Sequence, residues 1–500
     1  MKLIIDDRYI ALSELIGATS VSVSSEDSFC HTFNKGHDFL MKQIRDGKPI
    51  HGLSGKNYLA CEESALSQQN LYRSHACGVG EFLTPEISKL MVIIRLISLA
   101  KGRSGISYEA LKRLEMLLEA DIFPVIPSLG SVGASGDLTL LSYIAAVVAG
   151  EGEVWFDGRI FSTESIYEKL NITPYTFKPK EALAIMNGTA GMSAIALDSL
   201  RLFESLLDSM ESFVAGIFEV LQNDTTPLEN FVHESKPFEG QIQSASNIKE
   251  KLNGSGLTHK LGERYDKFFV DSEFNIQDNY SLRCAPQILG VVRDNLELSK
   301  KWVEQEINSV NDDPLIDGTN EVIYASGNFY GGYVAHAMDT LKICVANVAD
   351  LLDKEFALLV DDKFNRGLGE NLKLRKEHYF HGFKAMQITL SSLSADIIKN
   401  TTAASTHSRP TESLKQDKVS MGTTAALDFQ KMMEPLSLML SIAFIGLAQA
   451  VDIIGKTKAS PTLQKHYDII RSCVKPLMED RRMDGDIYAI KTKVTGGELA

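Results

Sequence analysis

Apolar residues recur at three- and four-residue intervals through long stretches of the chain. One stripe lies within residues 195–221, and a second runs through about 334–359. This spacing places apolar side chains on one face of a helix. Residues 432–454 are apolar on nearly every side, although Ser437, Ser441 and Gln449 interrupt the run 435–451. That run is short for a membrane span, so we expect a buried central helix.

Strand patterns are few and short. Residues 152–160 read as a hairpin, with Asp157 and Gly158 at its turn. The pattern therefore predicts an all-α protein, with a long helix bundle over residues 191–500 and a more irregular N-terminal region over 1–190. We expect the boundary near residue 190.

Composition narrows the class of protein and its partners. The 500 residues are 44% hydrophobic and 23% charged, enough for a large core. The net charge of −14, without a dense Lys/Arg cluster, disfavours nucleic acid and acidic lipid as partners. The six cysteines are scattered without a C-x-x-C pair, so no metal site is expected. Reduced thiols and an N-terminus without an apolar leader favour a cytoplasmic protein.

The segment 130–140, GSVGASGDLTL, carries the candidate chemistry. Its glycines could form a turn that enters a helix, with Ser135 as N-cap. They could also cradle a phosphate, as in a dinucleotide-binding fold. The spacing is G-x-x-G-x-x-G, however, and Pro124 and Pro127 stand where a central parallel strand is needed. The dinucleotide interpretation is therefore disfavoured.

A third interpretation is that the turn reacts with itself. The amide nitrogen of Gly136 would attack the carbonyl of Ala134, and loss of water would close a five-membered ring. Glycine suits the attacking position because it has no Cβ and tolerates unusual backbone angles. Loss of the Ser135 hydroxyl as a second water would leave 4-methylideneimidazole-5-one (MIO), an electrophile that no ordinary side chain supplies.

The sequence resembles the aromatic amino acid ammonia-lyase and aminomutase family (histidine, tyrosine and phenylalanine lyases) in a series of motifs. They stand in the family's order: QQNLYRSHACGVGEFL (68–83), GSVGASGDL (130–138), GEGEV (150–154), EALAIMNGT (181–189), QDNYSLRCAPQILG (277–290), NSVNDDPLI (308–316), GNFYG (327–331) and QDKVSMG (416–422). The resemblance implies the ammonia-lyase/fumarase-like superfold, the MIO group from Ala134-Ser135-Gly136, no metal, and a homotetramer whose sites take residues from several subunits.

The resemblance also assigns roles in the reaction. Arg283 matches the arginine that grips the substrate carboxylate, which a planar guanidinium can do with two hydrogen bonds; a structural ion pair is the other interpretation. Tyr280 is implied to be an acid/base group, and Gln277 and Asn187 to contact the ring or substrate. Gln277, Tyr280 and Arg283 would share a helical face. Asn187 could instead be a cap or turn residue beside Gly188.

Asp137 matches a residue that aids ring formation, although an acid in the first turn is also favoured by the helix dipole. Phe329 matches an aromatic that packs beside the ring, and it could equally be core.

Two positions concern the substrate. His75 occupies the place of the family's side-chain selector, and histidine there occurs in tyrosine and histidine lyases. Its imidazole can bond a phenol or another imidazole. Gln416 stands where histidine lyases carry Glu and where phenylalanine- and tyrosine-active members tend to carry Gln. Together these residues favour L-tyrosine over L-histidine, although His75 could be only structural.

The sequence departs from the family where the family has its β-proton base, a tyrosine. The aligned residue is His51, and much of the following motif is lost. Three explanations are open. His51 is the base, since imidazole has an ordinary pKa near neutrality; Tyr58 replaces it; or elimination is impaired. The sequence thus predicts an ammonia-lyase acting on an aromatic amino acid, with a 2,3-aminomutase or a non-catalytic scaffold as alternatives.

Overall fold

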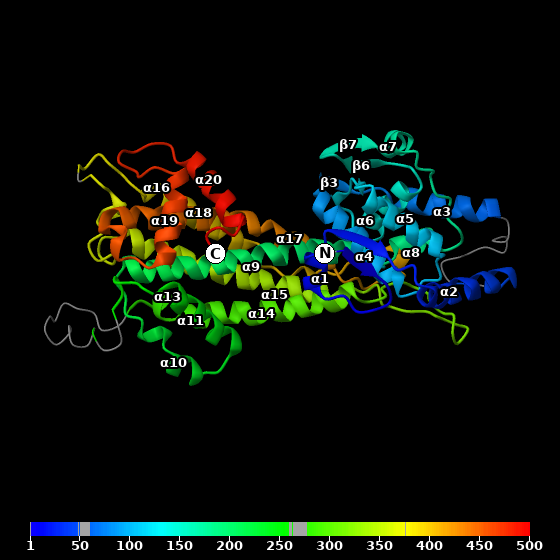
Figure 1. The fold of residues 1–500 in the computed structure, drawn as a ribbon, viewed down its shortest axis with the longest axis horizontal. Coiled ribbons are helices and arrows are strands. Elements are labelled where there is room, and N and C mark those ends of the chain that lie inside the picture. The colour runs from blue at the N-terminus through cyan, green and yellow to red at the C-terminus, as the bar shows by residue number, and fades with distance from the viewer. Residues whose placement is uncertain (1, 49, 51–60, 260–262, 264–277, 376) are drawn as a thin grey trace. The chain divides into compact units, whose positions relative to one another are not determined.

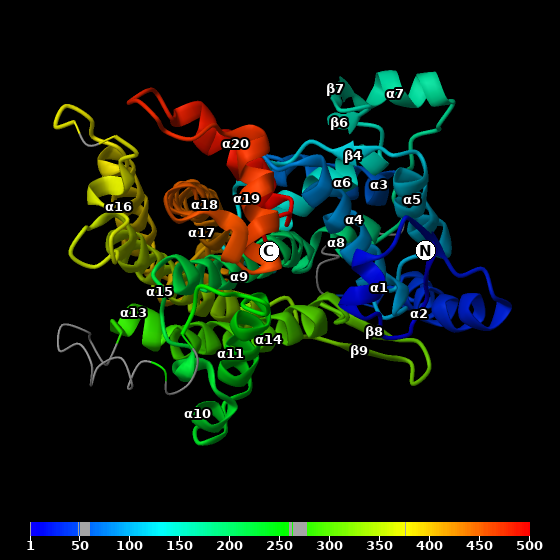
Figure 2. The ribbon, with the colours of Figure 1, turned by 60° about the vertical axis from the view of Figure 1, so that its left-hand side comes forward.

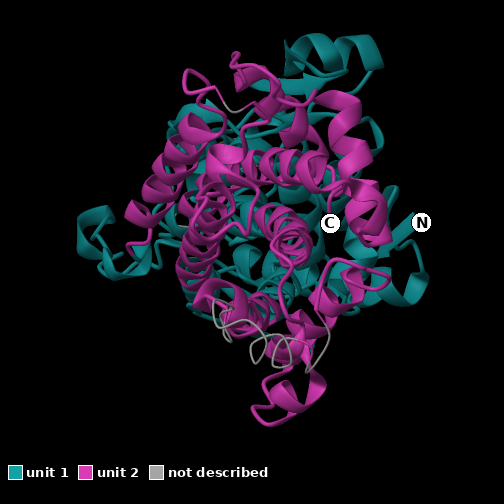
Figure 3. Ribbon diagram, turned by 90° about the vertical axis from the view of Figure 1, so that its left-hand side faces the viewer, with its two compact units in different colours: residues 1–198, 299–339, 403–427 teal, residues 199–298, 340–402, 428–500 magenta. Residues whose placement is uncertain are grey.

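A computed structural model describes residues 2–48, 50, 61–259, 263, 278–375 and 377–500. The described chain is mainly helical (Figure 1), which confirms the predicted all-α class. It forms two compact units, each made of three segments (Figure 3): unit 1 comprises residues 1–198, 299–339 and 403–427, and unit 2 comprises 199–298, 340–402 and 428–500. The division into 1–190 and 191–500 stays a prediction.

Unit 1 is built from short helices and strands. Its helices are α1 (Leu12–Ile16), α2 (Asp27–Arg45), α3 (Cys61–His75), α4 (Pro85–Ala100), α5 (Tyr108–Glu119), α6 (Leu138–Val148), α7 (Thr163–Leu170) and α8 (Glu181–Met186). Its strands are β1 (Lys2–Ile5), β2 (Ser20–Val23), β3 (Val79–Phe82), β4 (Phe123–Pro124), β5 (Pro127–Leu129), β6 (Glu153–Phe156), β7 (Arg159–Ser162), β8 (Leu315–Asp317) and β9 (Val322–Tyr324).

The strands pair into small sheets. β1 and β2 are parallel, whereas β3–β5, β4–β6–β7 and β8–β9 are antiparallel. The predicted hairpin is therefore β6–β7, with Asp157 and Gly158 in its turn, both at positive φ. The prolines before the glycine-rich segment lie in β4 and β5, which are short and antiparallel. They do not form the central parallel strand that a dinucleotide-binding fold needs.

Long helices carry the predicted apolar stripes. α9 (Ala190–Val220), α14 (Ala285–Ile307), α15 (Gly332–Val360) and α17 (Gly422–Lys431) each contribute residues to both units. In α9 the stripe residues are all buried, which confirms the expected amphipathic helix; they are Leu200, Phe203, Leu207, Met210, Val214, Ile217 and Phe218.

Unit 2 contains α10 (Asn230–Glu234), α11 (Glu239–Lys251), α13 (Tyr280–Arg283), α16 (Lys384–Lys399), α18 (Met433–Ile454), α19 (Pro461–Cys473) and α20 (Asp484–Thr495). Single-turn 3₁₀ helices are η1 (Thr226–Leu228), η2 (Glu370–Leu372) and η5 (Lys456–Lys458) in unit 2, and η3 (Ala404–Thr406) and η4 (Glu412–Leu414) in unit 1.

The helical stretch Gly422–Ile454, made up of α17 and α18, is long and apolar enough to cross a membrane. Most of α18 is nevertheless buried within unit 2. α16, α19 and α20 pack against it, as Figure 2 shows for α20. Its interrupting polar residues are satisfied internally. Ser441 donates to the Ser437 carbonyl at 2.7 Å, and Gln449 bonds the backbone of Leu372 and Leu477. The predicted buried central helix is confirmed.

The glycine-rich segment is positioned by α6, which it enters at Leu138. α6 contacts α3 and α8, and α3 contacts α8 (Figure 2). α6 is uncharged over its whole length, LTLLSYIAAVV, and buries Leu140, Leu141 and Ile144 completely. This rigid apolar packing fixes the turn at 133–136 against the end of α8.

Candidate functional site

The backbone at 133–136 is a tight turn with left-handed residues. Ser135 has φ 51° and Gly136 has φ 75°. A serine at positive φ is uncommon and marks local strain. A Cβ on Gly136 would collide with the backbone of Gly188, whose carbonyl accepts the Asp137 amide at 2.7 Å. The close approach of the two backbones therefore requires glycine at 136.

The buried carboxylate of Asp137 holds this turn in place through hydrogen bonds. It stands at the N-cap position of α6, but its carboxylate makes no cap bond. Oδ2 accepts from the Met192 amide at 2.7 Å, and Oδ1 accepts from the hydroxyls of Thr423 and, at 3.0 Å, Ser131. Complete burial raises the pKa of Asp137, and these hydrogen bonds oppose the rise. Ser135 is not the N-cap that the simplest interpretation of the turn predicts.

A pocket opens beside the turn, within unit 1. Its volume is about 370 Å³, and its lining includes Ala134, Ser135, His75, Asn187 and Gln416. The structure thus brings together residues that lie far apart in the sequence and that the sequence analysis singled out. The pocket is large enough for an amino acid with an aromatic side chain.

The amide of Gln416 is oriented toward Ser135. The Thr411 hydroxyl donates to Oε1 of Gln416 at 2.6 Å, and Nε2 of Gln416 donates to Ser135 Oγ at 3.2 Å. Thr411 also lines the pocket. Gln416 therefore presents an N–H donor at the residue expected to form the ring.

His75, the last residue of α3, holds one ring nitrogen against the backbone of its own helix. Its Nδ1 lies 2.8 Å from the carbonyl oxygen of Leu71. A carbonyl only accepts hydrogen bonds, so Nδ1 carries a hydrogen, and in the tautomer that this contact selects Nε2 is an acceptor. Such an acceptor suits a phenolic hydroxyl or the N–H of another imidazole.

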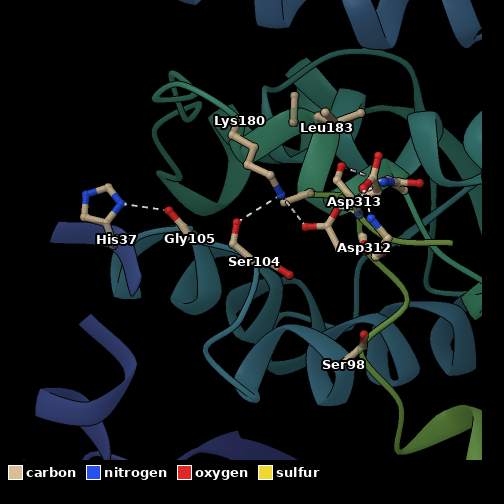
Figure 4. A network of polar contacts seen from close by, with 12 residues as sticks. His37, Ser98, Ser104, Gly105, Lys180, Leu183, Asp312 and Asp313 are labelled. Carbon is tan, nitrogen blue, oxygen red and sulfur yellow. Dashed lines mark hydrogen bonds and ion pairs between the residues drawn. The ribbon is translucent and has the colours of Figure 1, made fainter. Parts of the chain in front are cut away.

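Asn187 follows the last residue of α8 and is buried, with 3% of its surface exposed. Its Nδ2 donates to Asp312 Oδ1 and to the Asp313 carbonyl, both at 3.0 Å. Asp312 in turn forms a buried ion pair with Lys180 (Figure 4). Asn187 is thus a C-cap residue in position, but its side chain belongs to a polar network at the pocket.

Three other predicted residues, Tyr280, Arg283 and Phe329, do not line this pocket. Tyr280 and Arg283 form the short helix α13 in unit 2, where the Arg283 guanidinium lies 5.0 Å from the Tyr280 ring centroid. They share a face, but Tyr280 is 74% exposed. Phe329 is half-buried in unit 1 and does not line the pocket. His51, Tyr58 and Gln277 lie outside the described residues.

Four residues of the site were not predicted from the sequence: Lys180, Asp312, Thr411 and Thr423. Lys180 and Asp312 stand in or beside two of the quoted motifs, and a Lys in a buried segment is itself a signal, since it needs a partner. Thr423 follows the last motif directly. Thr411 lies in a loop outside every motif, and the sequence offers no signal for it.

Glu306 is a second buried carboxyl in unit 1. It accepts from Thr189 Oγ1 at 2.6 Å and from Asn311 Nδ2 at 3.0 Å. Burial raises its pKa to about 7. Glu306 lines a larger cavity of about 920 Å³ that is also bordered by Tyr9, Lys101 and Trp302. The lining of that cavity includes none of the predicted site residues, so we place the chemistry at the smaller pocket.

Comparison with known proteins identifies the family of the chain. Residues 10–472 match the model of the family described as aromatic amino acid lyase. A histidine ammonia-lyase of Shouchella clausii is 34% identical over 496 residues, covering 97% of this chain and 96% of that protein. Tyrosine aminomutase from Streptomyces globisporus has a TM-score of 0.94 at 29% identity (100% and 98% covered). Pantoea agglomerans phenylalanine aminomutase has a TM-score of 0.93 at 29% identity (99% of each chain covered).

Proposed function

The chain belongs to the aromatic amino acid lyase family and is a carbon–nitrogen lyase, and from this premise we propose that it eliminates ammonia from L-tyrosine, with L-histidine as the second substrate. The observation that carries the proposal is the pocket that joins Ser135 to His75, Asn187 and Gln416. The product would be an aryl acrylate, and the electrophile would be MIO formed from Ala134, Ser135 and Gly136.

The residues present fit that group. Gly136 has no Cβ and is pressed against Gly188, so its amide is held within the turn. Ser135 faces the pocket, where its hydroxyl is in contact with Gln416. When formed, MIO supplies an electrophile that makes the substrate amine a better leaving group. Asp137, Ser131 and Thr423 would hold the turn in shape.

The chain's own groups would bind and orient the substrate. His75 would accept the phenolic hydroxyl at Nε2, and Arg283 would grip the carboxylate with two hydrogen bonds. Holding both ends of the substrate places its β-carbon next to a base. Orientation of the substrate and proton transfer to the base would then both lower the activation barrier. We assign proton transfer to Tyr280 and to His51, the residue aligned with the family's tyrosine base.

We propose that the protein is cytoplasmic and a homotetramer whose active sites combine residues of several subunits. Among the described residues of a single chain, the pocket at Ser135 is lined by neither Arg283 nor Tyr280. The exposure of Tyr280 in a single chain supports a role beside another subunit.

Ultraviolet absorbance tests the proposed activity directly. The purified protein with L-tyrosine or L-histidine should yield a conjugated acrylate and ammonia in equal amounts. Each amino acid is assayed separately, with L-phenylalanine for comparison. A protein that carries the ring but changes none of the three would contradict the lyase assignment and favour the scaffold alternative.

A 2,3-aminomutase is the second candidate, because two structural neighbours at 29% identity are named as aminomutases. Return of ammonia to the β-carbon needs the same binding groups. Chromatography of the product mixture separates the alternatives. A β-amino acid as the main product from L-tyrosine would assign the mutase activity.

Gln416→Glu should move the preference toward L-histidine. A carboxylate accepts a hydrogen bond from an imidazole N–H more strongly than an amide oxygen does, so we expect the ratio of kcat/KM for histidine over tyrosine to rise by about tenfold. His75 is unchanged in this variant, which isolates position 416. An unaltered ratio would remove Gln416 from substrate selection.

His51→Phe should remove turnover while the ring still forms, if His51 takes the β-proton. Loss of a general base costs roughly 100-fold or more in kcat. The intact mass checks ring formation in the same sample. Full activity in this variant would move the role to Tyr58 or Tyr280, and Tyr58→Phe would then distinguish those two.

A further inference from the structure

Lys180 and Asp312 form an ion pair with no exposed surface on either side chain. Lys180 Nζ lies 2.5 Å from Asp312 Oδ2 and donates to the Ser104 carbonyl at 3.1 Å (Figure 4). Burial lowers the pKa of Lys180, and the nearby Asp312 carboxylate opposes that effect. Removing two charges from water is costly, and an apolar pair of similar volume often stabilises a protein equally well. Stability alone therefore does not account for this pair.

The ion pair controls the orientation of Asn187. Asp312 Oδ1 and the Asp313 carbonyl both accept from Asn187 Nδ2. A carboxylate paired with Lys180 and a backbone carbonyl have no hydrogen to donate. A reversed amide would place oxygen against oxygen at both positions, so Nδ2 must face Asp312 and Asp313.

The consequence is an oxygen atom without a hydrogen-bond donor. Asn187 Oδ1 is buried and has no hydrogen-bond partner among the described residues. An unpaired buried acceptor costs about 1–3 kcal/mol as a general rule. Asn187 lines the pocket beside Ala134 and Ser135, so a ligand N–H group that reached Oδ1 from the pocket would satisfy it.

We infer that Lys180 and Asp312 are positioning residues that turn the Asn187 amide so that its Oδ1 accepts a hydrogen bond from the amino group of the substrate. This inference rests on the proposed function for the identity of the ligand. It assigns Asn187 to the amino end of the substrate, while Arg283 is assigned to the carboxylate. The ammonium is held as a donor toward Oδ1, which would orient it near Ser135.

Binding measurements in a Ser135→Ala background test the inference without turnover. The probes are L-tyrosine, which carries the amino group, and 4-hydroxycinnamate, which has the same ring and carboxylate but lacks it. The double variant Lys180→Met/Asp312→Asn replaces the ion pair. The side-chain amide of residue 312 can then present either its oxygen or its nitrogen to Asn187, so the orientation of the Asn187 amide is no longer enforced. We expect L-tyrosine affinity to fall about tenfold, as for loss of a hydrogen bond to a charged group, while cinnamate affinity is unchanged.

Matched variants separate positioning from folding. Lys178→Met removes an exposed pair with Glu109, two residues away from Lys180, and should change neither affinity. Lys180→Arg keeps the charge and should retain L-tyrosine binding. Asn187→Ala should reproduce the selective loss, and adding the Lys180/Asp312 changes to it should cause no further loss. Asn187→Ala and Lys180→Arg keep the test decisive if the double variant does not fold.

Several results would contradict the inference about Lys180 and Asp312, and each can be told apart from the others. An equal loss for both probes would show a purely structural pair. Additive losses with Asn187→Ala, or no loss at all, would overturn the inference, as would a Ser135→Ala protein that binds cinnamate but not L-tyrosine. Turnover by the unsubstituted enzyme is measured separately, so failure of the lyase assignment is recognised independently of the amino-group comparison.

Discussion

Ser135→Ala should abolish turnover of L-tyrosine and L-histidine and leave a folded protein. Alanine has no hydroxyl to lose, so the exocyclic methylidene cannot form and the electrophile is absent. We expect kcat to fall by at least about 1,000-fold, which corresponds to roughly 4 kcal/mol in the activation barrier. Turnover is measured by acrylate absorbance, and folding is measured by thermal unfolding.

Ser165→Ala is a suitable control, because Ser165 is an exposed serine of α7 in the same unit. It should leave both activity and unfolding temperature unchanged. Near-normal turnover by a folded Ser135→Ala protein would mean that the reaction does not use a group derived from this serine.

Mixing the Ser135→Ala and Arg283→Met proteins should restore part of the activity that each lacks, and this is the second large expected effect. Arg283→Met should lower kcat/KM by roughly 100- to 1,000-fold, since two charge-assisted hydrogen bonds to the carboxylate are lost. If Ser135 and Arg283 of one active site come from different subunits, hybrids with Ser135→Ala chains contain intact sites. Random mixing would make about a quarter of the sites intact.

The experiment needs subunit exchange by dissociation and reassembly, or co-expression of the two variants with different tags. Each variant alone, treated identically, is the control. Hybrid assemblies with no activity above the two parents would place Ser135 and Arg283 of a site in one subunit, against the shared-site proposal.

The long helices were predictable because their stripes extend over many turns. Seven apolar positions in α9 point to one buried face, and α18 is apolar all round because it lies in the interior of unit 2. The strained turn was predictable at the level of residue type, since Gly136 needs a backbone approach that no side chain permits. What the turn lies against, the Gly188 backbone, required the fold.

The contacts that fix side-chain orientation were not predictable. Thr411 orients Gln416 from a loop outside every motif, and the Leu71 carbonyl sets the tautomer of His75. The Lys180–Asp312 pair joins residues 132 positions apart, and neither residue shows its partner in the sequence. Such pairings depend on the path of the chain in space, which periodicity and motif spacing do not encode.

The mass of the peptide that spans residues 134–136 tests the central claim most directly. In the mature, full-length protein, digestion and mass spectrometry should give this peptide two waters lighter than its sequence, whereas the Ser135→Ala peptide should not lose the second water. A peptide of unmodified mass from a fully matured sample would contradict the account, because Ala134, Ser135 and Gly136 would then form an ordinary open chain.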